Sequence, residues 1–164
     1  MKFRNILLWI EDNPELYLEL IHNTANKKGL ELVLATGISA LARKLEELNN
    51  LNNEETKISI KGIILDLLIY GEPTLESFGR SDIILKDNAY AGEYLLKTVL
   101  RNESVEDDNS IKFNLSKIPI LILTVMSQTK LTDFSSYGDL LELTHKYELD
   151  ETEERKIKSW INAL

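Results

Sequence analysis

Three largely apolar runs constrain the fold of this 164-residue chain more than any other sequence feature. They lie at residues 6–10, 58–69 and 118–124, and their apolar side chains do not alternate with polar ones as in a half-exposed strand. Such strands are typical of a parallel sheet with both faces covered by helices. Helical patterns alternate with the runs, so we predict an α/β fold with helices on both sides of the sheet.

The expected elements follow from the periodicity of apolar residues and from turn-forming residues. We expect strands at 6–10, 30–34, 58–69, 118–124 and 140–144, and helices at 14–28, 38–49, 89–101 and 150–164, with a weak helical pattern at 127–137. The apolar stripe of the first helix is expected to contain Leu16, Leu20 and Ile21. The polar stretches at 49–57, 70–88 and 102–117 are expected to be loop insertions into a single domain, 1–164.

Two helix starts carry recognisable capping residues. Asn13 is suited to the N-cap of the first helix and Pro14 to its first position. Asp150 and Glu153 have the spacing of a capping box, so the last helix is expected to begin after Asp150.

The composition excludes several classes of function. The formal charge of −8 argues against direct binding to nucleic acid. The chain has no cysteine, which excludes disulfides and thiolate metal sites and agrees with a reducing compartment. The amino-terminal apolar run is too short to span a membrane and lacks a small-residue cleavage site, so we expect a cytoplasmic protein without membrane insertion.

Chemically useful side chains stand at or near the ends of the predicted strands. Glu11 and Asp12 follow the first strand, Asp66 interrupts the third, Thr124 ends the fourth and Lys146 follows the fifth. In an open parallel sheet ligands bind beyond the carboxyl ends of the strands. We therefore expect these five side chains to gather at one edge.

The chemistry of this set indicates a metal site coupled to phosphoryl transfer. Crowded carboxylates repel one another, and an oxygen-only site suits a hard cation such as Mg²⁺. A carboxylate can act as a nucleophile toward phosphorus, while a cation, an ammonium group and a hydroxyl can stabilise the phosphoryl oxygens.

With these residues in order, the sequence resembles the receiver domain of two-component response regulators. Five segments carry the resemblance: ILLWIEDNPE, GIILDLLI, AYAGEYLLKTV, IPILILT and LTHK. They are similar to the family's acidic motif, phosphoacceptor strand, glycine-started third helix, hydroxyl-bearing strand and lysine-bearing strand. The resemblance implies a flavodoxin-like, doubly wound sheet of five parallel strands in the order 2-1-3-4-5.

The resemblance also implies roles for individual residues. Asp66 would accept a phosphoryl group from a phosphohistidine, and Thr124 and Lys146 would contact that group. Mg²⁺ would be held by Glu11, Asp12, Asp66 and the backbone carbonyl of Leu68. The implied partners are a sensor histidine kinase or a histidine phosphotransfer protein, and a downstream protein target. Such a protein accepts the phosphoryl group on its own aspartate and is not a turnover enzyme acting on external substrates.

Several residues depart from the family pattern and leave two alternatives open. Val125 follows the hydroxyl residue where the family has a small side chain, Leu143 replaces the switch aromatic, and Tyr147 replaces the proline after the lysine. These changes favour a pseudo-receiver that binds proteins without being phosphorylated. A Mg²⁺-dependent phosphohydrolase ranks last, because Leu68 stands where such enzymes carry a second acid.

Overall fold

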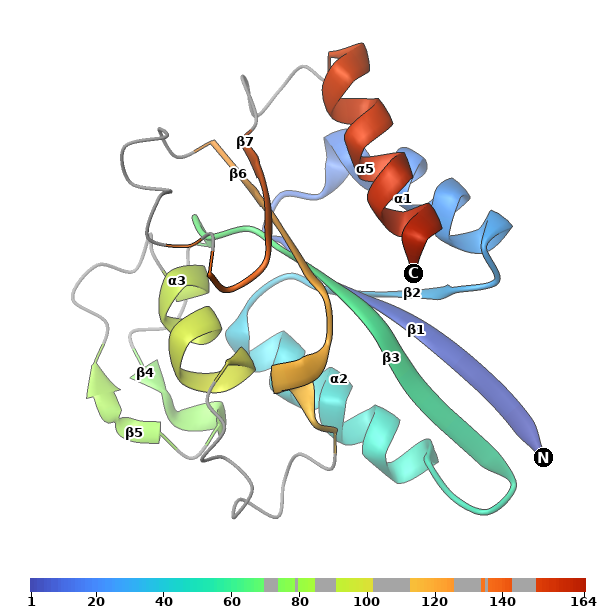
Figure 1. Cartoon of the computed structure of the whole chain (residues 1–164). Helices are drawn as coiled ribbons and strands as arrows, with labels where there is room; N and C mark the ends of the chain where they lie inside the picture. The colour runs from blue at the N-terminus through green and yellow to red at the C-terminus, as the bar shows by residue number, and fades with distance from the viewer. Residues whose placement is uncertain are drawn as a thin grey trace.

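A parallel sheet of five strands forms the centre of the protein, seen in a computed structural model (Figure 1). The structure describes residues 1–69, 74–78, 80–84, 91–101, 113–125, 134, 136–142 and 150–164. The strands are β1 (Lys2–Ile10), β2 (Glu31–Ala35), β3 (Thr56–Leu65), β6 (Ile120–Thr124) and β7 (Asp139–Glu142). Their order is β2-β1-β3-β6-β7 and every neighbouring pair is parallel, so the predicted α/β fold and its 2-1-3-4-5 order are confirmed.

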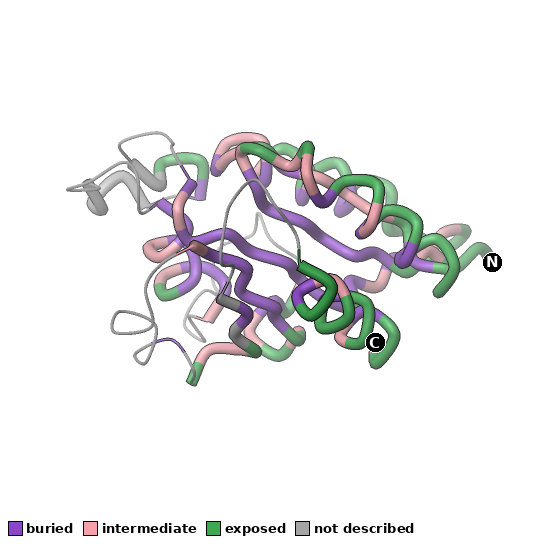
Figure 2. Tube along the Cα trace, turned by 90° about the horizontal axis from the view of Figure 1, so that it is seen from above, coloured by how far each residue is buried: buried purple, intermediate pink, exposed green. Residues whose placement is uncertain are grey.

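Helices cover both faces of this sheet. Figure 1 shows α1 (Glu15–Lys27) and α5 (Glu151–Ala163) side by side on one face. The other face carries α2 (Ile38–Leu51) and α3 (Ala91–Leu95), which continues as the π-helical turn η3 (Leu96–Leu100). Figure 2 shows the strands buried between these layers, while the helices expose their outer sides.

The apolar runs divide their side chains between two clusters. In β1, Ile6, Leu8 and Ile10 belong to the cluster packed under α2 and α3, which we call the α2-side cluster. Leu7 and Trp9 belong to the cluster packed under α1 and α5, which we call the α1-side cluster. All five side chains are 0% exposed, which explains why apolar residues occupy successive positions.

Two of the central strands have bounds that differ from the prediction. β1 begins at Lys2 rather than at 6. Its first residues pair with β3 alone, and three of the four are exposed, so they lack the apolar pattern of the covered part of the strand. β3 spans Thr56–Leu65 rather than 58–69, because the chain turns at Asp66, whose side chain accepts a hydrogen bond from the Leu68 N–H. The apolar residues after this turn are still covered, so hydropathy alone does not mark the end of the strand.

Of the two predicted helix caps, the one at α1 is wrong and the one at α5 is confirmed. The prediction of Asn13 as the first N-cap is wrong: Pro14 occupies the cap position, and α1 begins at Glu15 without a side-chain cap bond. The predicted capping box at α5 is confirmed, because the Asp150 carboxylate accepts hydrogen bonds from the N–H groups of Thr152 and Glu153, both at 2.7 Å. The Glu153 carboxylate accepts the reciprocal bond from the Asp150 N–H at 3.2 Å.

The predicted insertions contain more regular structure than expected. The first shrinks to residues 52–55, because α2 continues to Leu51 and β3 begins at Thr56. The second contains an antiparallel pair, β4 (Thr74–Leu75) and β5 (Arg80–Ile84), joined through the 3₁₀ turn η1 (Glu76–Phe78). Phe78 anchors this turn in the α2-side cluster. In the third, the structure describes the 3₁₀ turn η5 (Leu115–Lys117), while 102–112 and most of the weak helical pattern at 127–137 lie outside the described residues.

Arg101 connects the segments that lead into β6 and β7. Its guanidinium donates hydrogen bonds to four backbone carbonyl groups, those of Leu115, Ser116, Ile118 and Tyr137, at 2.8–3.1 Å. Partial burial lowers the pKa of Arg101, but an arginine stays charged at any physiological pH. These bonds tie the end of η3 to the segments that precede β6 and β7.

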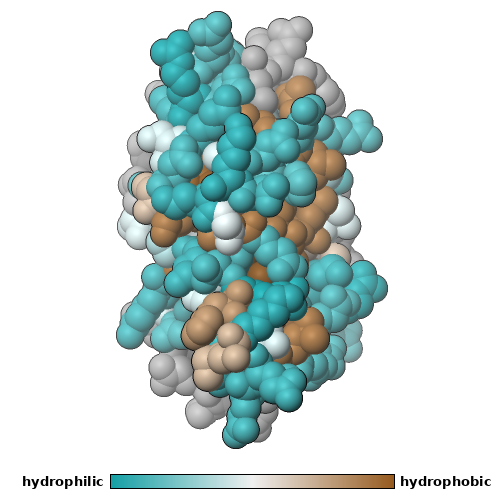
Figure 3. Space-filling model, turned by 90° about the vertical axis from the view of Figure 1, so that its right-hand side faces the viewer, coloured by the Kyte–Doolittle hydropathy of each residue, from teal (hydrophilic) through white to brown (hydrophobic). Residues whose placement is uncertain are grey.

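The surface is largely polar on the side where the amino terminus lies. Figure 3 shows hydrophilic side chains over most of this face, with apolar patches between them. Among the helices that the structure describes, none combines the length and hydropathy needed to cross a bilayer.

Candidate metal and phosphoryl site

Backbone pairing places two of the predicted acidic positions at the carboxyl edge of the sheet. Ile10 pairs with Leu65, and the Asp66 N–H donates to the Ile10 carbonyl at 3.0 Å. On the other side of β1, the Glu11 N–H donates to the Ala35 carbonyl at 3.1 Å. Glu11 and Asp66 therefore continue the ladder by one residue, where β1 and β3 end side by side.

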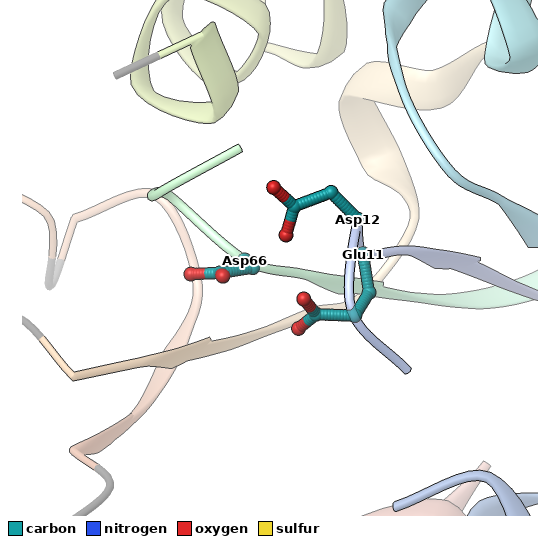
Figure 4. A group of neighbouring side chains, drawn as sticks. All are labelled: Glu11, Asp12 and Asp66. Carbon is teal, nitrogen blue, oxygen red and sulfur yellow. The ribbon is translucent and has the colours of Figure 1, made fainter. Parts of the chain in front are cut away.

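The structure brings three acidic side chains together at this edge. Each of Glu11, Asp12 and Asp66 offers a carboxylate oxygen, and these oxygens all lie within 4.8 Å of one another. Figure 4 shows Glu11 and Asp12, at the end of β1, on either side of Asp66, with the three carboxylates reaching into the same space. Glu11 and Asp66 are each 3% exposed and Asp12 is half-buried. We refer to these three residues as the acid cluster.

Local turns orient the two buried carboxylates. Glu11 Oε1 accepts a hydrogen bond from the Asn13 N–H at 2.9 Å, and Asp66 Oδ1 accepts one from the Leu68 N–H at 3.0 Å. In both cases the donor is the backbone two residues later, so each acid organises the turn that follows its own strand. The first of these turns leads into α1.

Thr124 ends β6 at the same edge. It is 1% exposed and pairs with Glu142 of β7. Because Leu65 pairs with Ile122, Thr124 lies two residues beyond the last pair between β3 and β6.

The structure describes two of the other residues that the sequence analysis named, and three lie outside the described residues. Leu68 is half-buried in the turn after Asp66, and its carbonyl remains an expected ligand. Val125 is half-buried and packs against the α1-side cluster. Lys146, Leu143 and Tyr147 lie outside the described residues.

Tyr17 is a buried polar residue near the acid cluster that the sequence analysis did not single out. The apolar stripe of α1 is rotated relative to the prediction: Tyr17, Ile21, Thr24 and Ala25 are buried, while Leu16 and Leu20 are half-buried. The pKa of the Tyr17 hydroxyl is raised to about 12, first by burial and then by nearby negative charges. Those charges, in decreasing order of effect, are the carboxylates of Glu153, Glu11 and Asp66.

This shift predicts a loss of stability in alkali. The unfolded chain has an ordinary tyrosine pKa of about 10, whereas the folded protein holds the Tyr17 proton until about pH 12. Between these values the folded state binds more protons, so the free energy of unfolding falls as the pH rises. The contribution is complete below a pH of about 10 and is lost at about 12. Urea unfolding at pH values of about 9 and 11 should give a smaller loss for Tyr17→Phe than for the wild type; equal losses would contradict the assignment.

The donor set of the acid cluster suits a hard divalent cation. Three carboxylates held this close repel one another, and two of them are almost fully removed from water. Oxygen-only sites rich in carboxylates favour Mg²⁺, Ca²⁺ or Mn²⁺ over softer metals. The residues present therefore fit a magnesium ion that keeps several of its waters.

This chain has no detectable relative by sequence but many by structure. No protein-family model matches the sequence. A search of curated proteins finds no significant match. Many solved structures do match over nearly the whole chain.

The matching structures named here are all receiver domains or response regulators. The signal receiver domain of a DNA-binding response regulator from Colwellia psychrerythraea has 13% identity and a TM-score of 0.55, over 96% of this chain and 98% of its own. The Mn²⁺-bound form of the response regulator Rcp1 has 14% identity and a TM-score of 0.54, over 97% and 96%. A receiver domain from Rhodospirillum rubrum has 13% identity and a TM-score of 0.53, over 96% and 92%. The chain therefore has the fold of a response-regulator receiver domain.

Proposed function

We propose that this protein is a receiver that is phosphorylated on Asp66 in a Mg²⁺-dependent reaction and signals by changing which protein binds to its surface. The phosphodonor would be a phosphohistidine of a sensor histidine kinase or of a histidine phosphotransfer protein. Because such donors are made from ATP, we place the reaction in the cytoplasm. The protein would accept the phosphoryl group on its own side chain and would not turn over external substrates.

The acid cluster is the observation that carries this proposal. Glu11 and Asp12 follow β1, and Asp66, at least 54 positions later in the chain, follows the neighbouring strand β3. The three residues direct carboxylate oxygens to within 4.8 Å of one another. The fold places this edge where open α/β sheets bind ligands. A Mn²⁺-bound response regulator of the same fold supports a divalent cation as the occupant.

In the proposed reaction each residue has a separate task. One Asp66 oxygen attacks the phosphorus, the new O–P bond forms as the P–N bond of the donor breaks, and the leaving imidazole takes up a proton. Glu11, Asp12, Asp66 and the Leu68 carbonyl would hold Mg²⁺, which supplies positive charge to offset that of the phosphoryl group when it is bound. Thr124 would donate a hydrogen bond to a phosphoryl oxygen. Lys146 would pair with another oxygen.

Loss of phosphorylation in Asp66→Asn is the direct test. Wild-type protein incubated with acetyl phosphate and Mg²⁺ should gain the mass of one phosphoryl group, and hydroxylamine should remove it, because acyl phosphates react with this nucleophile. Asparagine keeps the shape of the side chain but lacks the nucleophilic oxygen, so the gain should disappear. Intact-mass spectrometry measures both results. Retention of the modification in Asp66→Asn would refute the assignment.

A matched control separates loss of chemistry from loss of charge. Glu46→Gln removes one exposed carboxylate from α2 that does not belong to the acid cluster, so it should leave the mass gain unchanged. If wild type shows no modification and no response to Mg²⁺ under any small phosphodonor, the pseudo-receiver takes the place of this proposal. Val125 and the replaced residues Leu143 and Tyr147 are what favour that alternative.

A further inference from the structure

The amino-terminal part of β1 lies at an open edge of the sheet. β1 pairs with β3 from Lys2 onward, but β2 pairs with β1 only from Ile6. Figure 1 shows this part of β1 extending beside β3 to the end of the molecule where the amino terminus lies. From Lys2 to Asn5, the side of β1 that faces away from β3 therefore has no neighbouring strand in the described part of the chain.

The backbone of Phe3 directs both of its polar groups to this open side. In a parallel ladder, successive residues of a strand form their hydrogen bonds with opposite neighbours. The Lys2 N–H donates to the Glu55 carbonyl at 2.7 Å, so Lys2 bonds toward β3 and Phe3 toward the open side. The Glu11 N–H, an even number of residues after Phe3, accordingly bonds to Ala35 at the end of β2. The edge thus offers one donor and one acceptor at Phe3.

The chain closes the other open edge of these two strands with its own side chains. β6 pairs with β3 only from Ile63, so the first residues of β3 are also without a strand on that side. There Asn53 Oδ1 accepts a hydrogen bond from the Thr56 N–H at 2.9 Å, and Asn52 Oδ1 accepts one from the Ile58 N–H at 3.1 Å. Edge groups that are occupied in this way cannot pair with a further strand, whereas a bare edge can.

We propose that the open edge of β1 pairs with the same edge of a second copy of this chain, antiparallel and about a two-fold axis at Phe3. Each Phe3 N–H then donates to the Phe3 carbonyl of the other copy, because outward-bonding residues exchange both bonds in such a pair. The two rings become cross-strand neighbours, a contact that stabilises antiparallel strands. Met1 and Phe3, the most exposed large apolar residues that the structure describes at 79% and 70%, are then partly covered.

The charges beside this edge favour a second copy as its occupant. In this register Lys2 lies opposite Arg4 of the second copy, and like charges directly opposite one another destabilise a pair. The charge of Arg4 is offset within its own chain, because its Nε donates to the Glu31 carboxylate at 2.9 Å. The Glu31 side chain is still 47% exposed, and Lys2 makes no salt bridge with a residue that the structure describes. Each Lys2 therefore finds a carboxylate partner in Glu31 of the other copy.

Sedimentation velocity of the untagged protein over a wide range of concentrations tests this interface. The wild type should show a reversible equilibrium between monomer and dimer. Phe3→Pro removes the N–H that the interface uses, while the ladder between β1 and β3 keeps its bonds, and proline is tolerated on an edge strand. The variant should therefore keep the far-UV circular dichroism spectrum of the wild type, but the dissociation constant of its dimer should rise about tenfold or more.

Matched substitutions locate the contact. Phe3→Ala should weaken association, whereas Leu18→Ala, which trims an exposed apolar side chain on α1, should leave it unchanged. Lys2→Glu should also weaken association, because it places a carboxylate beside Glu31 of the other copy. Lys57→Glu makes the same change of charge on β3, one strand away from the open edge, and should have a much smaller effect.

The outcomes are independent of the proposed function, because the acid cluster lies at the opposite end of β1 from Phe3. Association should be equally strong in EDTA and in Mg²⁺, so a failure of the metal proposal leaves this interface standing. A wild type that stays monomeric at every concentration overturns the inference. A dimer with the same dissociation constant in Phe3→Pro overturns it as well.

Discussion

Replacing Gly92 by alanine is expected to destabilise the protein by about 3 kcal/mol or more and to disturb the acid cluster. A Cβ atom built on Gly92 would overlap the Asp66 carbonyl oxygen and lie 2.8 Å from the Leu67 Cα. Both are backbone atoms that follow β3, a strand held between β1 and β6. Neither can rotate out of the way as a side chain could, so one of the two segments has to move.

Each possible movement has a cost that can be measured. If α3 moves outward, it withdraws Leu95 and the η3 residue Leu96, both 0% exposed, from the α2-side cluster. If the turn after β3 moves, Asp66 is displaced from Glu11 and Asp12. For a chain of this size, a loss of about 3 kcal/mol lowers the melting temperature by roughly 6–12 °C. Calorimetry measures the first effect and a Mg²⁺ titration the second.

Gly37 provides the matched control. It is the N-cap residue of α2, its backbone is extended, and a Cβ atom built there would meet no atom within 4 Å. Gly37→Ala should therefore cost less than about 1 kcal/mol and leave Mg²⁺ binding intact. Equal stability of the Gly92 and Gly37 variants would show that α3 does not approach Asp66 this closely.

The fold could be predicted from the sequence where both sides of a strand are covered. Such strands carry apolar residues at successive positions, which is why the carboxyl-terminal halves of β1 and β3 were found. The amino-terminal half of β1, with Phe3 and Asn5 exposed, lacks this pattern and was missed. The β4–β5 pair was missed for a related reason: its strands are too short to show a period, and a single residue, Phe78, anchors the turn between them.

The acidic part of the site was predictable from the strand ends, but the residue that the first helix places near it was not. The position of Glu11, Asp12 and Asp66 after apolar runs predicted the acid cluster, because parallel strands end at one edge. Tyr17 gave only a weak pattern: it lies four residues before Ile21 and seven before Thr24, a helical spacing that a stripe through Leu16 and Leu20 obscured. Which residues of α1 are buried depends on the elements that pack against it. These include α5, which is far away in the sequence.

The acid cluster predicts opposite effects of one substitution with and without metal. In the absence of a divalent cation, Asp12→Asn removes one of three mutually repelling charges that lie within 4.8 Å. We expect the neutral variant to be about 1–2 kcal/mol more stable than the wild type in EDTA, because like charges this close oppose folding. In Mg²⁺ the order should reverse: a ligand present at 100 times its dissociation constant stabilises the wild type by about 2.7 kcal/mol, and a variant without the Asp12 carboxylate loses most of that gain.

The reversal of the order of stability between EDTA and Mg²⁺ identifies a cation site, because neither effect alone does so. A stabilising Asp12→Asn in EDTA could arise from the general acidity of the chain, whose formal charge is −8. Glu46→Gln changes the net charge by the same amount on the exposed face of α2, so it should shift neither the melting temperature nor its Mg²⁺ dependence by comparable amounts. If Asp12→Asn destabilises the protein in EDTA, repulsion among the three carboxylates does not limit the stability of the metal-free protein. The charge argument for metal binding would then fail.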